Sequence, residues 1–566
     1  MKEEEYFVKT KTFGPVLETR EFTDDEKVVL GHFFTNIDRN IYAATDAMPN
    51  SLWALLEGGY SRSQVSMRMR FLNIFEEMKE ECDKGLLPEG DVVSVKDFAS
   101  QIRDNKGLNM SFFLRKAEQF MRKWAVQYGH DSLKDSDVVR FAVENITQLA
   151  VPAIQEARLG AYQEKSSRYV PFSKESLVVP IELKDFEKEI REWNDFLLDS
   201  YNESKSFVSD FFRKTLNQSA FASEAAFDRT VNAKTLDVIR YFLPVTIMTS
   251  LGIVWPTREA ERHISRLMSD SRQEIQEIGR ALLEEGKKVS PGLLSHVAVN
   301  DYQQVREKNI RSMPGISLNK PSQEKGRSSD AVKLISISPD IEAGMAAAVL
   351  FEHCSSGNSY DEYLQACLKD KALVESVLKE YLENRGKFDS VPVPIETGNL
   401  LFEVTVDMGA FRDLKRHRRN LFLWAPFTAL KGFEYPEHVS SAPELVEVKK
   451  KIELCAEKTA KLHEKVLAKN PRLAEYIVMM ANKQRMLWQM DPRQFVYVME
   501  LRTTPAGHYS YRTICQKMFR LASPHLPVLS KYTRINLTSG DEGRKQQEEK
   551  TVEKLKALGA DVRRVS

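Results

Sequence analysis

Apolar and polar residues alternate over residues 402–408, where every second position is apolar. Alternation with a period of two indicates a strand with one buried face, so we predict a strand here. A helix is predicted directly after it, over residues 410–419. Residues 138–146 are a second, less regular strand candidate, followed by a predicted helix over residues 151–158. Gly160, just past that helix, is typical of a helix C-terminus.

Each strand–helix pair is followed by longer regions that we predict to be helical. These regions cover residues 184–212 and 233–252 in the first half and residues 444–467 and 474–490 in the second. Residues 241–254 are the most apolar stretch, but they fall short of the roughly 20 residues of a membrane-spanning helix, so we interpret them as a buried core helix. The same order of elements therefore occurs twice. It predicts an α+β fold with two tandem lobes, each with a small sheet packed by helices and a helical subdomain.

The composition of the chain predicts where its domains begin and end. Residues 301–333 hold Lys, Arg, Gln, Ser, Pro and Gly with few apolar side chains, which indicates a linker or a long loop. At 566 residues the chain exceeds the usual size of a single hydrophobic core. We predict an N-terminal lobe over residues 1–300, a C-terminal lobe over residues 334–535 and a charged tail over residues 536–566. The role of the first hundred residues stays open.

The charge balance and the cysteines limit the class of protein and the cellular compartment that we expect. The chain has 82 Lys and Arg against 81 Asp and Glu, a formal net charge of +1, which argues against a protein that mainly coats nucleic acid. Its five cysteines are scattered without a C-x-x-C pair, so we expect neither a metal site nor a disulfide framework. The N-terminus lacks the basic-then-apolar order of a secretory signal. We expect a cytoplasmic protein that does not bind membranes.

A candidate phosphate loop lies in the first half. Glu164, Ser166, Ser167 and Arg168 fall within five positions. Two hydroxyl groups, backbone N–H groups and a guanidinium group are the donors that a phosphate monoester needs. Glu164 can accept a hydrogen bond from a ribose hydroxyl or orient Arg168. By itself the Ser-Ser-Arg tripeptide is weak evidence, because it is common in surface loops.

A cationic cluster lies in the second half, where Lys415, Arg416, His417, Arg418 and Arg419 are consecutive. By default such a run is a solvated basic end of a helix, where cations meet the negative end of the helix dipole. Two observations favour a functional site. The cluster occupies the place in the element order that the first half gives to residue 158, and the residues after it, 421–427, are too apolar for a solvated loop.

Together these two segments resemble the signature R-H-R-x-x-S-x-N-E-Q-S-x-R-Y of the flavin-dependent thymidylate synthases, the ThyX family. Residues 156–169 keep the E-x-S-x-R-Y end and lack the leading Arg-His. Residues 415–420 keep Arg-His-Arg and lack that end. Such complementary loss suggests a fused duplication in which two degenerate lobes assemble one composite site.

A third segment extends the resemblance. Residues 488–493 and 500–502 are similar to the family stretch W-T-x-N-x-R … L-x-L-R. The resemblance implies that Asp491, which replaces the family Asn, and Arg493 contact the flavin, and that Arg502 reaches the pyrimidine. The counterpart in the first half, residues 255–266, fits only loosely. Each of these arginines taken singly also fits the surface of an amphipathic helix.

Two further positions match more weakly. Arg240, in the sequence Ile-Arg-Tyr-Phe-Leu-Pro, resembles the arginine of the family motif R-x-V-L-P, which touches the nucleotide. Glu475 stands at that place in the second half. His130, in Tyr-Gly-His-Asp-Ser, resembles a family histidine near the flavin, although a lone histidine is usually structural. The sequence does not decide whether His508 contributes another flavin contact.

The resemblance implies reductive methylation of dUMP to dTMP, with methylenetetrahydrofolate as carbon donor, FAD as hydride carrier and NADPH as reductant. Family sites form between subunits of a homotetramer, so we predict a homodimer that forms a pseudo-tetramer with half the usual number of competent sites. The implied dUMP contacts are Glu164, Ser166, Ser167, Arg168, Arg240, Arg416 and the catalytic Arg502. The implied FAD contacts are His130, Arg416, His417, Arg418, Asp491 and Arg493.

Three alternatives stay open. In the first, the chain is a catalytically inactive homologue that binds flavin or nucleotide. Asp491 and Glu475 favour this alternative, because they stand where the family motifs have asparagine and arginine. In the second, the chain is a flavoenzyme that acts on another uracil nucleotide. Or it is a nucleic-acid-binding protein that uses residues 415–419 as a basic patch, which the net charge makes the least consistent of the three.

Overall fold

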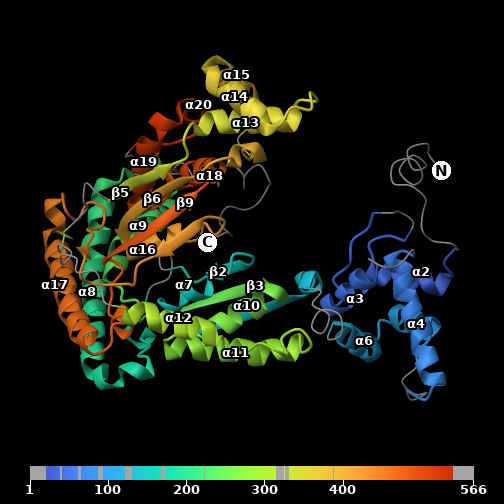
Figure 1. The fold of residues 1–566 in the computed structure, drawn as a ribbon. Coiled ribbons are helices and arrows are strands. Elements are labelled where there is room, and N and C mark those ends of the chain that lie inside the picture. Colours follow the sequence, from blue (N-terminus) through green and yellow to red (C-terminus); the bar gives the residue numbers. More distant parts are fainter. Residues whose placement is uncertain are drawn as a thin grey trace.

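The computed structural model describes residues 21–37, 41–60, 65–86, 93–121, 131–166, 172–221, 223–313, 324–325, 331–386 and 388–538. Within these ranges the chain forms an N-terminal helical bundle and two lobes of mixed helix and sheet (Figure 1). None of the helices in these ranges has both the length and the apolar content required to cross a membrane.

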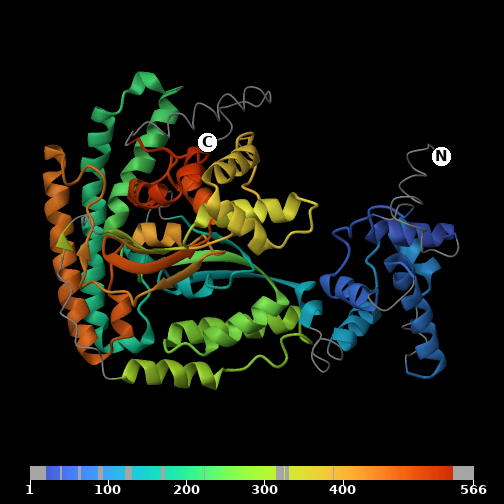
Figure 2. The same ribbon diagram turned by 45° about the horizontal axis from the view of Figure 1, so that its top comes forward.

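The N-terminal bundle has a core of its own and lies to one side of both lobes in Figures 1 and 2. Its helices are α2 (Asp24–Phe33), α3 (Asn50–Tyr60), α4 (Met67–Asp83), α5 (Val95–Arg103) and α6 (Ser111–Met121). Packed aromatic rings fill the centre, among them Phe71, Phe75 and Phe113. The Asn50 amide donates to the Val138 carbonyl at 3.2 Å, which ties the bundle to the first strand of the first lobe.

The first lobe holds a three-stranded antiparallel sheet in the order β1-β3-β2. Its strands are β1 (Val138–Thr147), β2 (Ala161–Glu164) and β3 (Met248–Pro256). Its main helices are α7 (Ala150–Ile154), α8 (Glu187–Thr215), α9 (Glu224–Ile239), α10 (Thr257–Met268) and α11 (Gln273–Val289). Leu251, Ile253 and Trp255 of β3 are buried against α10 and α11 in a separate core.

The second lobe repeats this arrangement and adds one strand, giving the order β5-β6-β9-β7. Its strands are β5 (Val332–Ile337), β6 (Leu400–Asp407), β7 (Leu421–Trp424) and β9 (Lys483–Met490). Its helices are α13 (Ile341–His353), α14 (Tyr360–Lys369), α15 (Lys371–Leu382), α16 (Met408–Leu414), α17 (Val446–Lys469), α18 (Pro492–Arg502), α19 (Tyr509–Ala522) and α20 (Pro527–Lys531).

The two lobes correspond element by element. The pairing β1-β3-β2 in the first matches β6-β9-β7 in the second. Thr147 ends β1 and its hydroxyl accepts the backbone N–H of Ala150 at 3.2 Å. Asp407 ends β6 and its carboxylate accepts the N–H of Ala410 at 2.9 Å. The predicted α+β fold with two tandem lobes is therefore confirmed, and these two capping residues fix the equivalence of positions.

The lobes are joined along a backbone contact. The Val245 N–H donates to the Val478 carbonyl at 2.9 Å, and the Met480 N–H donates to the Leu243 carbonyl at 2.8 Å. Helices α8 and α17 lie side by side at the far edge of the molecule in Figures 1 and 2. One hydrophobic core continues from α8 and α9 into the second lobe, so neither lobe buries its apolar surface alone.

Several predicted elements differ from the structure. The predicted core helix over residues 241–254 is wrong, because its second part is strand β3. The helical prediction for residues 474–490 fails in the same way, since β9 covers its end. Apolar runs of this length fit a buried strand as well as a helix, and the β-branched residues near β3 favour the strand.

The shorter helices and the linker also differ. Helices α7 and α16 end at Ile154 and Leu414, well before the predicted ends, and the remaining residues form turns that carry the candidate site. The predicted linker begins with an exposed helix, α12 (Asp301–Ser312). The charged tail lies outside the described residues from position 539 onward.

Candidate functional site

The two half-motifs lie against each other across the lobe boundary. Arg418 donates from Nη2 to the Gly160 carbonyl, and its guanidinium lies 4.6 Å from the ring centroid of Tyr162. Gly160 and Tyr162 precede and enter strand β2, whereas Arg418 lies in the turn between α16 and β7. The turns on which the sequence argument depends therefore meet.

A cavity of about 1010 Å³ opens beside this contact, and we call it the first cavity. Cationic side chains from both lobes line it: Arg158 from the first, and Arg385, Arg416, Arg418, Arg419, Arg493, Arg502 and Arg534 from the second. His417, Tyr497 and Phe388 contribute rings to the same lining. Such a lining fits a large anionic ligand with a planar part.

His417 and Arg502 are hydrogen-bonded to each other in the first cavity. The Arg502 Nε donates to His417 Nε2 at 2.7 Å, and its Nη2 donates to the Asp413 carbonyl at 2.9 Å. Burial, together with the neighbouring Arg502 and Arg416 charges, lowers the pKa of His417 to about 3. His417 is therefore neutral at pH 7, and because Nε2 accepts from an arginine, its proton resides on Nδ1.

Arg416 and Arg240 are linked through one carboxylate. Arg416 is half exposed, with Nη2 3.4 Å from Asp413 Oδ1, and it lines the first cavity. Arg240 is buried, with Nη1 3.6 Å from Asp413 Oδ2, and does not line that cavity. Its equivalent in the second half, Glu475, pairs with Arg472. Asp413 therefore links Arg240 to Arg416, which lines the first cavity. The predicted dUMP contact of Arg240 stays a prediction.

The flavin candidates at the start of α18 are placed differently. Arg493 lines the first cavity, with Nη1 2.5 Å from Glu396 and Nε 2.6 Å from the Val391 carbonyl. The Asp491 carboxylate caps α18 by accepting the Gln494 N–H at 2.7 Å, and burial raises its pKa. Asp491 is not among the residues that line the first cavity. Its predicted flavin contact stays a prediction.

The phosphate loop is described only in part. Glu164, at the end of β2, forms a buried ion pair with Arg412 of α16 and accepts a hydrogen bond from Gln155 at 3.3 Å. Ser166 follows in the described chain, whereas Ser167 and Arg168 lie outside the described residues, as does His130. Glu164 thus binds the second lobe through Arg412.

Comparison with known proteins identifies this arrangement. The model of the family Thy1, thymidylate synthase complementing protein, matches two separate stretches, residues 92–292 and 333–528. The chain belongs to this family. The two matched stretches cover the two lobes, and the first also includes α5 and α6 of the N-terminal bundle. The resemblance to ThyX proteins and the tandem repeat are therefore both confirmed.

Relatives of similar length and shorter ones both occur. A UPF0159 protein of Chlamydia muridarum is 28% identical over 549 residues, covering 93% of this chain and 98% of that protein. A UPF0159 protein of Thermoplasma acidophilum is 24% identical over 437 residues, covering 72% of this chain and 86% of that protein. A flavin-dependent thymidylate synthase of Sulfurisphaera tokodaii is 27% identical over 191 residues, 34% of this chain and 65% of that protein.

This Thy1-family chain carries a second cavity of about 530 Å³ at the equivalent place in the first lobe. We call it the second cavity. Helix α10 lines it where α18 lines the first cavity, and the turn after α7 replaces the turn after α16. Counted from the capping residues Thr147 and Asp407, Glu156 and Ala157 take the places of Arg416 and His417.

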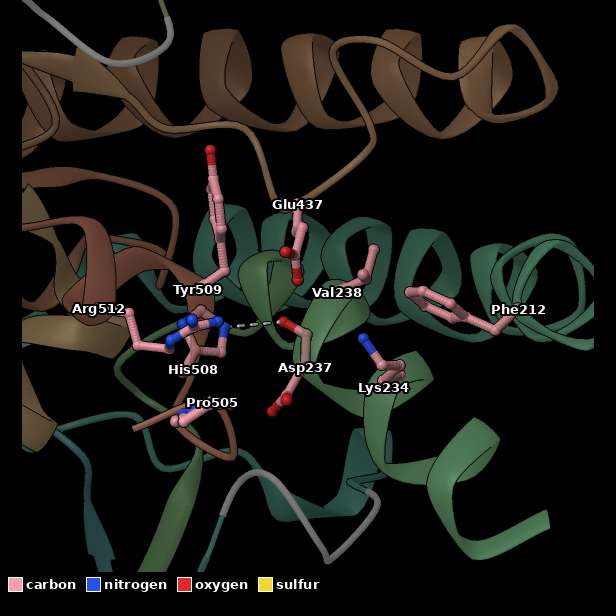
Figure 3. A pocket seen from close by; sticks show the side chains of 10 residues that line it. Phe212, Lys234, Asp237, Val238, Glu437, Pro505, His508, Tyr509 and Arg512 are labelled. Carbon is pink, nitrogen blue, oxygen red and sulfur yellow. Dashed lines mark hydrogen bonds between the residues drawn. The ribbon is translucent and has the colours of Figure 1, made fainter. Parts of the chain in front are cut away.

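A third, much smaller cavity of about 30 Å³ lies between α9 and the start of α19 (Figure 3). Lys234, Asp237, Glu437, His508 and Arg512 are among its lining residues. His508 caps α19, and its ring stacks on Tyr241 at 6.0 Å. A space of this size holds little more than a water molecule, so His508 does not face a cofactor-sized cavity here.

Several residues that line the first cavity had no ligand assigned to them from the sequence. Arg158 occupies the third position of the family signature, so a residue-by-residue count of the motif identifies it. Arg385 and Arg534 come from segments without a motif and meet at the Arg385 and Gly386 carbonyls, to which Arg534 donates at 2.8 and 2.6 Å. No local sequence signal predicts that contact.

Proposed function

We propose that this Thy1-family protein methylates dUMP to dTMP at the first cavity, with methylenetetrahydrofolate as carbon donor, FAD as cofactor and NADPH as reductant. The observation that carries the proposal is the shared lining: Arg158 of one lobe and Arg416, His417, Arg418 and Arg502 of the other line one cavity. A site of this composition requires both halves of the divided signature.

The donor set of the first cavity fits FAD. Several guanidinium groups suit a pyrophosphate, because they bind phosphate oxygens in pairs. Arg418 has a buried Nε that lacks a partner among the described residues, so a donor there is available to an anion. We assign Arg416, His417, Arg418 and Arg493 to the flavin. When bound, FAD supplies the hydride chemistry that no amino-acid side chain provides.

Arg502 is the residue that we assign to the uracil ring. Its Nε and Nη2 are held by His417 and the Asp413 carbonyl, so the plane of the guanidinium is fixed. Its Nη1 forms no hydrogen bond with the described residues, which leaves that nitrogen for a ligand. A fixed cation beside the ring stabilises negative charge that develops there during methyl transfer.

The phosphate of dUMP is assigned to Ser166, Ser167 and Arg168. The Glu164–Arg412 ion pair supports this assignment, because it anchors the end of β2 just before these residues. Removing a charged hydrogen-bond partner costs about 1.5–3 kcal/mol, so Arg168→Ala should weaken dUMP binding roughly 10- to 100-fold. Arg520→Ala, on the exposed side of α19, serves as a control and should bind dUMP normally. Unchanged binding by Arg168→Ala would refute the assignment.

The activity itself is tested by spectroscopy and product analysis. The purified protein should show flavin absorption bands that NADPH bleaches, and should form dTMP from dUMP and methylenetetrahydrofolate. A protein without flavin and without product contradicts the proposal. Flavin and dUMP binding without product would instead identify an inactive homologue, a reading that the occupied cap position of Asp491 favours.

The assembly is part of the same proposal. We propose a homodimer in which four lobes form a pseudo-tetramer with two competent sites. Two chains of 65.0 kDa give a mass of about 130 kDa. Sedimentation equilibrium should return this value, and a mass of one chain at micromolar concentration would refute the dimer.

A further inference from the structure

The second cavity contains a buried polar group without a partner. Asn420 is 4% exposed and lines this cavity, yet its Oδ1 and its Nδ2 find no hydrogen-bond partner among the described residues. A buried amide left unpaired is costly, and native proteins rarely keep one without a reason. The equivalent position in the first lobe is Gly160, so this amide is particular to the second cavity.

A side-chain amide such as that of Asn420 can recognise the hydrogen-bonding edge of a nucleobase. Its oxygen accepts and its nitrogen donates side by side, which matches the donor and acceptor pairs on the edges of uracil and adenine. Strand β7 supplies the neighbouring walls, with the partly buried ring of Phe422 and the Trp424 ring, over which Lys415 Nζ lies at 4.4 Å. The surroundings of Asn420 therefore suit a flat heterocycle.

The rim of the second cavity is cationic. Four arginines line it (Arg158, Arg262, Arg266 and Arg418) against two carboxylates (Glu156 and Glu259), while the Lys415 amino group is buried against the Pro152 carbonyl. Glu156 pairs with Arg266, and Glu259 lies 3.9 Å from the 75% exposed Arg262. The excess of cations remains after these pairs are formed, so an anionic group at the mouth is favoured.

We propose that the second cavity is a nucleotide-binding site distinct from the first, in which Asn420 binds the nucleobase and the rim arginines bind the phosphate. The ligand is a nucleobase carried on a phosphate, supplied either by a free mononucleotide or by the nucleotide end of a dinucleotide. Because Arg158 and Arg418 line both cavities, an occupant of the second cavity contacts residues of the first.

Equilibrium dialysis of the purified full-length protein with dUMP and, separately, with AMP tests this site. At least one of the two nucleotides should bind at a site that Arg168→Ala, the variant expected to weaken dUMP binding at the first site, leaves intact. Asn420→Leu, which removes the amide at similar volume, should weaken that binding roughly ten-fold or more. The same dialysis reveals the second site whether or not the protein turns over dUMP.

Two further variants keep the test decisive if Asn420→Leu does not fold. Arg262→Glu reverses an exposed rim charge on α10 and should also weaken binding about ten-fold, whereas Arg280→Glu makes the same change on α11 and should not. Flavin content, measured in parallel, separates the two ligand sources. Loss of FAD by Asn420→Leu with unchanged mononucleotide binding assigns the cavity to the dinucleotide end. Unchanged binding of dUMP, AMP and FAD in both variants would overturn the proposal.

Discussion

The two cavities occupy equivalent places in the two lobes, yet their chemistry has diverged in pairs of residues. In the first cavity His417 accepts a hydrogen bond from Arg502 at 2.7 Å. At the equivalent positions, counted from Thr147 and from the start of α10, the first lobe has Ala157 and Leu267, both buried. Both members of the pair therefore differ between the lobes: two hydrogen-bonded polar residues in one lobe correspond to two apolar residues in the other. Either change alone would leave a polar group without its partner.

Contacting residues also differ in pairs between the two lobes beside the phosphate loop. The buried ion pair between Glu164 and Arg412 joins the lobes on one side. The equivalent residues on the other side are Trp424 and Pro152, and there Lys415 donates to the Pro152 carbonyl and lies over the Trp424 ring. The two sides therefore keep contact by different means, one through paired charges and the other through a buried lysine.

The largest effect is expected from breaking the charged contact. Arg412→Leu leaves the Glu164 carboxylate buried without its partner, which should lower the free energy of unfolding by about 3–5 kcal/mol. The double variant Arg412→Leu with Glu164→Leu imitates the apolar side and should recover most of that loss. Urea denaturation measures both. Equal destabilisation of the single and the double variant would show that the charge is not the cause.

The next largest effect concerns turnover. Arg502→Ala should reduce kcat about 10²- to 10³-fold, the typical loss when one fixed donor for a developing anion is removed. A control outside both cavities, Arg280→Ala on the exposed side of α11, should keep kcat within about two-fold. A dTMP-forming assay compares the two variants. Similar losses in both variants would show that Arg502 has no specific role in turnover.

The buried lysine gives a pH-dependent difference. Burial lowers the pKa of Lys415 from 10.5 to about 7, so between these values the unfolded chain binds a proton that the folded chain does not. Stability of the parent should therefore rise with pH from 7 toward 10.5, by about 2 kcal/mol between pH 7 and 8.5. Lys415→Met lacks this gain, whereas Lys461→Met, on the exposed side of α17, keeps it. Parallel pH profiles of the parent and Lys415→Met would contradict the lowered pKa.

The smallest effect is expected at the cap of α18. Asp491→Asn restores the residue type of the ThyX motif, and asparagine caps a helix as well as aspartate, so stability should change by less than about 0.5 kcal/mol. Asp491→Ala should cost about 1 kcal/mol. If the first cavity binds flavin next to this cap, the asparagine variant should bind FAD at least as tightly as the parent. Weaker binding would show that the carboxylate has taken over a role of its own.

Local sequence patterns predicted the features of the fold that are determined by residues close together in the chain. The alternation at 402–408 gave strand β6 nearly as observed, and the divided signature identified turns that do meet across the lobes. Strands β3 and β9 were missed because their apolar runs fit two kinds of element. The partner of Glu164 was missed because Arg412 lies in the other lobe, and tertiary pairing of that kind leaves no trace in spacing.

The backbone contact between Leu243, Val245, Val478 and Met480 has a consequence for how such a protein can change. Because the two halves are one polypeptide, they stay associated at any dilution, and their local concentration is set by the chain. In a symmetric oligomer of identical subunits every substitution appears at all equivalent places. Here one lobe can accumulate substitutions while the sequence of the other is retained, so the second cavity can come to bind a different ligand from the first.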